Sequence, residues 1–142
     1  MRIIAGPCQH EGLAQSAEIA RECKRVCDKY GIEYYFKASY DKANRSSLGG
    51  ERGMGLEATL TDFLALKVTL GVKTLTDVHD YTQVKRIERE FKDAVDVYQI
   101  PAFLCRQTDL IQAACATDKI VNIKKGQFMA PWDMAGVLSK CD

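Results

Sequence analysis

Residues 36–47 of this 142-residue chain read FKASYDKANRSS, and they mark the passage from an apolar run into a polar segment. The segment combines two lysines, one arginine, one asparagine and three serines. Ammonium, guanidinium and hydroxyl groups bind phosphate and carboxylate oxygens well. A solvated loop is also polar. The segment by itself therefore leaves two interpretations open, an anion-binding site or an exposed connection.

Short apolar runs on both sides of this segment predict five strands. They cover residues 3–5, 34–36, 73–76, 95–100 and 120–123, and several are continuously apolar, as strands buried on both faces are. Helices are expected between them, at residues 13–30, 56–70, 84–91 and 110–116, with another that begins near Pro131. Gly31 and Gly71 follow the first two helices, where glycine is a natural terminator. This alternation predicts an α/β fold with a parallel sheet and helical crossovers, in one domain.

The overall composition narrows the class of protein. Apolar residues make up 46% of the chain and charged residues 27%, which is typical of a soluble globular domain. The net charge is +1 and no apolar run reaches about 20 residues, so neither nucleic-acid binding nor a membrane span is expected. Six cysteines show neither a disulfide framework nor a Cys-x-x-Cys pair. We therefore expect a cytoplasmic protein with reduced thiols.

Polar side chains follow each predicted strand, where parallel α/β proteins bind their ligands. The first four strands are followed by Cys8, by Lys37 and Lys42, by Asp77 with His79, and by Gln99; the fifth is followed by Asn122 and Lys124. Cations dominate this predicted rim, which favours substrates that carry phosphate and carboxylate groups. The Asp77–His79 pair could orient hydroxyls or move protons, but a hydrogen-bonded loop histidine fits the pattern as well.

Cys8 follows Gly6 and Pro7 at the end of the first predicted strand. Such a cysteine could be a nucleophile, a metal ligand or a small buried residue. A nucleophile needs a base beside it, and His10 is a poor candidate because consecutive strand residues point in different directions. A metal ligand needs two or three partners. The residues alone leave these three interpretations open.

Four motifs together resemble the 3-deoxy-D-manno-octulosonate 8-phosphate synthase family. They are FKASYDKANRSS at residues 36–47, TDVH at 76–79, QIPAFLCRQTD at 99–109 and NIKKGQF at 122–128. Their order and spacing match the family over nearly the whole chain. The resemblance implies a TIM (β/α)8 barrel, of which this chain would cover about the first five βα units. It also implies condensation of phosphoenolpyruvate with arabinose 5-phosphate, releasing phosphate, in lipopolysaccharide biosynthesis.

The resemblance also implies roles for individual residues. It implies that Lys42, Asp77 and His79 act in catalysis. On the phosphoenolpyruvate side, or between the two substrates, it places Lys37, Ser39, Lys42, Gln99 and Lys124. It places Asn44, Arg45, Ser46, Asp77 and His79 toward arabinose 5-phosphate, with Arg45 and Ser46 near its phosphate. Because the family is tetrameric, Phe103 and Arg106 are expected to reach the site of a neighbouring subunit.

A metal is implied at Cys8. Members of the family that need no metal carry asparagine at this position, whereas metal-dependent members carry cysteine after Ala-Gly-Pro, as residues 5–8 do here. Gly126 also matches the metal-dependent type. The resemblance therefore makes Cys8 a ligand of a divalent metal, iron, zinc or manganese. The remaining ligands of the family would lie beyond residue 142.

The length departs from the family pattern, because a complete barrel has eight βα units and about 250 residues. We therefore expect residues 1–142 to form a partial barrel, truncated at its C-terminal end. Two alternatives to the synthase stay open. One is the related 3-deoxy-7-phosphoheptulonate synthase, which uses erythrose 4-phosphate instead. The other is an inactive partial barrel that serves only in assembly.

Overall fold

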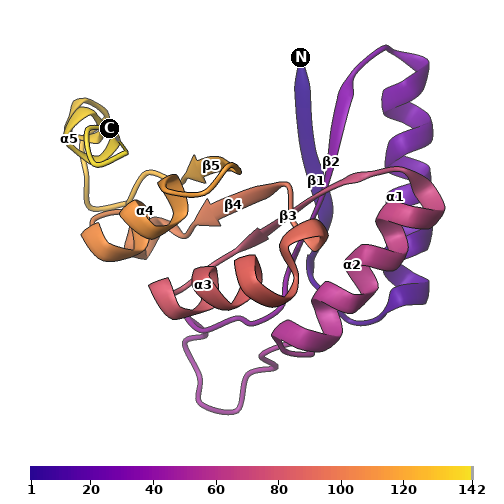
Figure 1. The fold of residues 1–142 in the computed structure, drawn as a ribbon, viewed down its shortest axis with the longest axis horizontal. Coiled ribbons are helices and arrows are strands. Elements are labelled where there is room, and N and C mark those ends of the chain that lie inside the picture. Colours follow the sequence, from indigo (N-terminus) through magenta and orange to yellow (C-terminus); the bar gives the residue numbers. More distant parts are fainter. Residues whose placement is uncertain (142) are drawn as a thin grey trace. The chain divides into compact units, whose positions relative to one another are not determined.

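The computed structural model describes residues 1–141, which form two compact units. Unit 1 holds residues 1–76 and 93–96, and unit 2 holds residues 77–92 and the described residues from 97 onward. Strands and helices alternate along the chain (Figure 1), which confirms the predicted α/β class. Their bounds in unit 1, with β3 ending at the boundary, are β1 (Arg2–Gln9), α1 (Leu13–Lys29), β2 (Glu33–Ser39), α2 (Leu56–Leu70) and β3 (Lys73–Asp77).

The three strands of unit 1 pair in parallel, in the order β1, β2, β3. The β1–β2 register runs regularly from Arg2 opposite Glu33 to Ala5 opposite Phe36, and resumes with Cys8 opposite Ala38. Strand β1 thus carries one extra residue at Gly6–Pro7, which is a β-bulge. Proline suits a bulge because it cannot donate a ladder hydrogen bond. The bulge sets the direction of the residues that follow.

Helices α1 and α2 lie side by side in unit 1 (Figure 1), and α1 packs on β1 and β2. Between helices and sheet lie fully buried side chains, among them Phe36, Leu60 and Phe63. The rings of Phe36 and Phe63 meet edge to face, with centroids 5.6 Å apart, an arrangement that adds to their apolar burial. Helix α2 ends as predicted at Gly71, which adopts a left-handed φ of 62° and donates its N–H to Lys67 O.

Unit 2 repeats the strand–helix pattern. Its elements are α3 (Tyr81–Glu90), β4 (Val97–Ile100), α4 (Thr108–Cys115), β5 (Ile120–Ile123) and α5 (Met134–Leu138). Strands β4 and β5 pair in parallel, with Val97 opposite Ile120 and Ile100 opposite Ile123. Tyr98 and Ile111 are fully buried in its core, and the Tyr98 hydroxyl donates to Glu88 at 2.7 Å.

Several predicted boundaries differ from the structure, and two of the differences, at the starts of α3 and β4, have identifiable reasons. Helix α3 begins at Tyr81 rather than at residue 84, because the Asp80 carboxylate caps it by accepting from the N–H groups of Thr82 and Gln83. Strand β4 begins at Val97 rather than at residue 95. Asp96 instead accepts a hydrogen bond from the Thr74 N–H at 2.8 Å and pairs with Lys67 at 2.7 Å, which removes it from the ladder.

Strand β5 has the predicted bounds, and β1 to β3 are longer than predicted by one to five residues. The helix expected near Pro131 begins there with a 3-10 turn, Pro131–Asp133, and continues as α5. Within residues 1–141, no helix is both long and apolar enough to cross a bilayer.

The bulge predicts that Gly6 tolerates no side chain. A Cβ at Gly6 would lie 1.9 Å from the carbonyl oxygen of Lys37, so we expect Gly6→Ala to lower the free energy of unfolding by about 3 kcal/mol or more. Gly49→Ala is the matched control, since a Cβ there meets nothing within 4 Å, and should change it by less than about 0.5 kcal/mol. Urea unfolding of both variants measures this. Equal stability of the two variants would contradict the close approach.

An ionic network at the start of the unit 1 strands predicts a pH dependence. Hydrogen bonds from Lys73, Tyr35 and Arg2 lower the pKa of Glu33 from 4.5 to about 2. A lowered pKa in the folded state means that the network stabilises folding above about pH 4.5 and that this contribution is lost as the pH falls toward 2. We therefore expect Glu33→Gln to destabilise the protein at pH 6 and to have little effect near pH 2.

Unfolding titrations from pH 6 to pH 2 check this expectation. Glu18→Gln, on the exposed face of α1, serves as the control for the loss of one negative charge. A Glu33→Gln effect that stayed constant across the range would speak against the network.

Candidate active site

The carboxyl end of β1 begins the site of unit 1. After the bulge, Cys8 adopts a φ of 71°, the one positive φ among the described non-glycine residues. A left-handed conformation is costly for most side chains and often marks functional positions. It leaves the Cys8 side chain exposed, whereas the next residue, Gln9, is only 9% exposed.

Two lysines converge beside Cys8 on one hydroxyl. Lys37 Nζ lies 2.9 Å and Lys42 Nζ 2.8 Å from Ser39 Oγ, which is fully buried. Lys37 Nζ also donates to Cys8 O at 3.2 Å, and Lys42 Nζ to Cys8 Sγ at 3.1 Å. We call these four residues the lysine cluster. Because Ser39 Oγ accepts from both ammonium groups, its own O–H remains a donor. The cluster thus presents two positive charges and a hydroxyl donor.

Arg45 lies in the segment 40–55 that follows β2, and its guanidinium donates two hydrogen bonds. Nη2 donates to Gln9 Oε1 at 2.7 Å and Nε to Glu51 O at 2.9 Å. The same segment is closed by backbone bonds from Lys42 to Arg52 and from Gly55 to Tyr40. The neighbouring Asn44 and Ser46 are exposed, so the structure leaves both accessible but assigns them no partner.

Arg52 closes the same segment through its side chain. It forms a two-pronged ion pair with Asp41, with Nε–Oδ1 and Nη2–Oδ2 distances of 2.7 and 2.5 Å. The hydrogen bonds that Arg52 donates to the Asp41 carboxylate raise the pKa of Arg52. The Asp41 carboxylate is thereby occupied by Arg52.

His10 is fully buried behind the lysine cluster. Its Nδ1 lies 2.9 Å from Ser16 Oγ on α1, and its Nε2 lies 2.8 Å from Asp62 Oδ2 on α2. Serine, histidine and aspartate also form the triad of many hydrolases. Here Ser16 and His10 are both 0% exposed, so no substrate can reach them. The three side chains instead tie the end of β1 to both helices, while the His10 N–H donates to Ser39 O.

In unit 2, the predicted pair of Asp77 and His79 is in contact. His79 Nε2 lies 3.0 Å from Asp77 Oδ2, with both side chains about 10% exposed. The His79 N–H donates to Gln83 Oε1 at 2.7 Å, which fixes the start of α3. This geometry fits a proton-transfer pair and equally a hydrogen-bonded loop histidine.

Two further predicted residues of unit 2 follow β4 and β5. Gln99 faces Asn122 across the β4–β5 register, and Asn122 Nδ2 donates to Gln99 Oε1 at 3.2 Å. Lys124 comes directly after β5, where its N–H donates to Ile100 O and its side chain is exposed. The amide pair and the ammonium group therefore lie at the carboxyl ends of these two strands.

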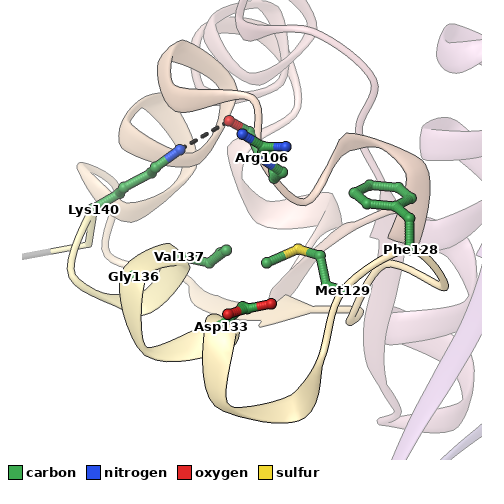
Figure 2. A pocket seen from close by; sticks show the side chains of 7 residues that line it. All are labelled: Arg106, Phe128, Met129, Asp133, Gly136, Val137 and Lys140. Atoms are coloured by element: carbon green, nitrogen blue, oxygen red, sulfur yellow. Dashed lines mark hydrogen bonds between the residues drawn. The ribbon is translucent and has the colours of Figure 1, made fainter.

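Phe103 and Arg106 lie on the connection between β4 and α4, and both are exposed. Arg106 lines a pocket of about 400 Å³ together with residues of the segment 128–140, and Figure 2 shows it there with Phe128, Met129 and Lys140. Lys140 Nζ donates to Arg106 O at 2.8 Å. The pocket is lined wholly by residues of unit 2, and it contains none of the lysine cluster.

Gly126 has a structural reason to be glycine. It is buried, and a Cβ would lie 2.9 Å both from Cys105 Sγ and from Phe128 Cζ. Contacts this short do not occur in folded proteins without a shift of the neighbours. A larger residue at this position therefore requires different packing of Cys105.

Residues 1–141 do not complete a metal site. No group of three or more histidine, cysteine, aspartate or glutamate side chains is placed in the described chain to hold an ion. Cys8 has the donor type and the exposure of a single thiolate ligand. The described residues thus supply one candidate ligand.

Sequence reasoning missed two residues of this site. Gln9 and His10 stand in the polar run after the first strand, but no role was assigned to Gln9 and His10 was considered only as a base. Their roles depend on Arg45 and Asp62, which are 36 and 52 residues away. A polar pair directly after a buried strand was the available signal.

Comparison with known proteins gives two findings. The model of the DAHP synthetase I family matches residues 1–142. This chain is similar to proteins named 2-dehydro-3-deoxyphosphooctonate aldolase. It shares 53% identity with the one from Chelativorans sp. (strain BNC1), 52% with the one from Nitrobacter hamburgensis and 51% with the one from Rhodopseudomonas palustris (strain TIE-1). Each alignment covers 99% of this chain and 47–49% of the relative. The chain therefore spans about half the length of these relatives.

The buried histidine generates a stability prediction. Asp62→Ala leaves His10 Nε2 without its partner in a fully buried position, so we expect a loss of about 1–3 kcal/mol in the free energy of unfolding. Asp62→Asn keeps an acceptor oxygen and should lose less than half as much. Chemical denaturation measures both. An equal loss in the two variants would show that the hydrogen bond does not stabilise the strand end.

Proposed function

This chain belongs to the DAHP synthetase I family, and on that premise we propose that it acts in the condensation of phosphoenolpyruvate with D-arabinose 5-phosphate. The products are 3-deoxy-D-manno-octulosonate 8-phosphate and inorganic phosphate. The relatives at 51–53% identity carry a name of the enzyme of this reaction. That name matches the family that the four sequence motifs resemble, and it favours this reaction over the heptulosonate alternative.

The observation that carries the proposal is the convergence of Lys37 and Lys42 on Ser39 Oγ, at 2.9 and 2.8 Å. Two ammonium groups this close repel each other, and an anion between them removes the repulsion. Phosphoenolpyruvate carries a carboxylate and a phosphate. We assign its anionic groups to the lysine cluster, where the Ser39 hydroxyl can donate a further hydrogen bond.

The sugar phosphate is assigned to the segment 40–55. Arg45 offers a guanidinium at the carboxyl end of β1, and Asn44 and Ser46 are exposed beside it. A guanidinium binds phosphate through paired N–H donors. In unit 2, Gln99, Lys124, Phe103 and Arg106 remain proposed substrate contacts, the last two toward a neighbouring subunit.

The reaction joins C3 of the enolpyruvate to the aldehyde carbon of the sugar. Water adds at C2, and phosphate then leaves with cleavage of the C–O bond. As the new carbon–carbon bond forms, negative charge develops on the aldehyde oxygen, and fixed cationic donors such as Lys42 stabilise it. The Asp77–His79 pair is proposed to orient the sugar hydroxyls or to pass a proton to this oxygen.

We extend the proposal to a divalent metal, iron, zinc or manganese, with Cys8 as one ligand. Such a metal would orient the sugar aldehyde or activate water. The exposed thiol, 3.1 Å from Lys42 Nζ, supports the donor role. A cytoplasmic location, a homotetramer and a place in lipopolysaccharide biosynthesis complete the proposal.

The proposed reaction is tested by measuring phosphate release in the full-length protein. We expect release from phosphoenolpyruvate to require arabinose 5-phosphate, with a kcat/KM at least about 100-fold higher than with erythrose 4-phosphate, because the shorter sugar leaves polar groups of the site unpaired. Preference for erythrose 4-phosphate would establish the heptulosonate reaction instead. If no phosphate is released with either sugar, only an assembly role is left for this chain.

The metal proposal predicts the behaviour of Cys8→Asn. Asparagine accepts a left-handed backbone better than most residues, so it fits the φ of 71° at this position while removing the thiol. We expect the metal content per subunit, measured by elemental analysis of the purified protein, to fall by more than half. Cys23→Asn on α1 is the control for the loss of a thiol outside the site and should leave the metal content unchanged. Undiminished metal in Cys8→Asn would remove Cys8 from the ligand set.

A further inference from the structure

We propose that Gln9 is a positioning residue that holds Arg45 at the sugar-phosphate subsite, an inference that rests on the proposed function. Gln9 lies between the exposed Cys8 and the buried His10, and only 9% of it is exposed. Its Oε1 accepts a 2.7 Å hydrogen bond from Arg45 Nη2. The contact joins the end of β1 to a segment 36 residues further along the chain.

Gln9 is itself firmly placed. The next residue, His10, is bonded through its ring to Ser16 and Asp62 and through its N–H to Ser39 O. On the other side, Cys8 pairs with Ala38 in the β1–β2 ladder, as Gln9 does with Ser39. The Gln9 amide is therefore a fixed point against which a more mobile side chain can be oriented.

Arg45, by contrast, is exposed and belongs to a segment with glycines at positions 49, 50, 53 and 55. Its stem packs against Gly50, where a Cβ would come within 3.2 Å of Arg45 Cβ and Cγ. Among residues 1–141, its other hydrogen bond is to Glu51 O, within the same segment. Within the described chain, Gln9 thus supplies the side-chain hydrogen bond that joins the guanidinium to the sheet.

The pattern of hydrogen bonds leaves donors for a ligand. A guanidinium has five N–H donors, and Arg45 uses its Nε–H and one N–H of Nη2. Both donors of Nη1 and the second of Nη2 have no hydrogen-bond partner within the part of the chain that the structure describes, and they are enough for paired contacts to a phosphate group. Because Gln9 holds one edge of the Arg45 guanidinium, the opposite edge faces a ligand in a defined direction. This lowers the entropy cost of ordering Arg45 when a phosphate binds.

The test uses Gln9→Met, which keeps the length of the side chain and removes the acceptor. In the full-length protein we expect the KM for arabinose 5-phosphate to rise about ten-fold, the value of one hydrogen bond to a charged group. The KM for phosphoenolpyruvate should change less than two-fold. Gln15→Met, an exposed position on α1, is the matched control and should change neither.

A double-mutant cycle shows whether Gln9 acts through Arg45. Arg45→Met alone should raise the KM for the sugar phosphate more than Gln9→Met does, and adding Gln9→Met to it should then change this KM less than two-fold. A second ten-fold rise in the double variant, or no rise in Gln9→Met, would overturn the proposal.

A measurement independent of turnover separates this inference from the proposed function. Hydrogen exchange of the arginine side-chain N–H groups, followed by NMR, should be slow for Arg45 in the unsubstituted protein and in Gln9→Glu, which keeps an acceptor. It should be fast in Gln9→Met. Equal exchange in Gln9→Glu and Gln9→Met overturns the positioning role. An unsubstituted protein that shows this pattern but no turnover overturns the proposed reaction and supports the Gln9–Arg45 contact.

Discussion

The close approach of β1 to β2 at Gly6 is the constraint from which the site of unit 1 follows. A Cβ at this position would lie 1.9 Å from Lys37 O, so the chain needs glycine there. The extra residue of the bulge turns Cys8 into a left-handed conformation with a φ of 71°. The same turn directs Gln9 toward Arg45 and His10 toward α1 and α2. Three consecutive residues thereby take three different roles.

The positions of the two positive charges in the lysine cluster follow from this backbone arrangement. Lys37 and Lys42 come from β2 and the segment after it, and both reach Ser39 Oγ and an atom of Cys8. A buried hydroxyl and a carbonyl orient ammonium groups without neutralising them, so the positive potential remains for a ligand. A preorganised cationic site costs little further ordering when an anion binds. We infer that the buried contacts of His10 stabilise this strand end and so offset the repulsion between the two ammonium groups.

Much of this arrangement could be predicted from the sequence. Short apolar runs rich in β-branched residues predicted all five strands. Helix α2 ends as expected at Gly71, which adopts a left-handed conformation. The segment 36–47 contributed Lys37, Ser39 and Lys42, whose spacing places them together because they lie on one strand end and the turn after it. Local patterns of this kind are visible within about ten residues.

What could not be predicted depends on contacts between distant segments. Strand β4 starts two residues later than predicted because Asp96 bonds to Thr74 and Lys67. Nothing in residues 95–100 indicates these contacts. His10 was considered as a possible base for Cys8, yet its partners come from two helices and its ring is fully buried. The positive φ of Cys8 depends on the bulge, and a Gly-Pro pair alone does not specify which following residue becomes left-handed.

A crystal structure of the full-length protein with phosphoenolpyruvate bound tests the central claim most directly, because it locates the anion itself. Our account predicts carboxylate or phosphate oxygens within hydrogen-bonding distance of Lys37 Nζ, Lys42 Nζ and Ser39 Oγ, with the Gly6–Lys37 contact unchanged. Phosphoenolpyruvate bound elsewhere, with the lysine cluster in contact only with solvent, would contradict it.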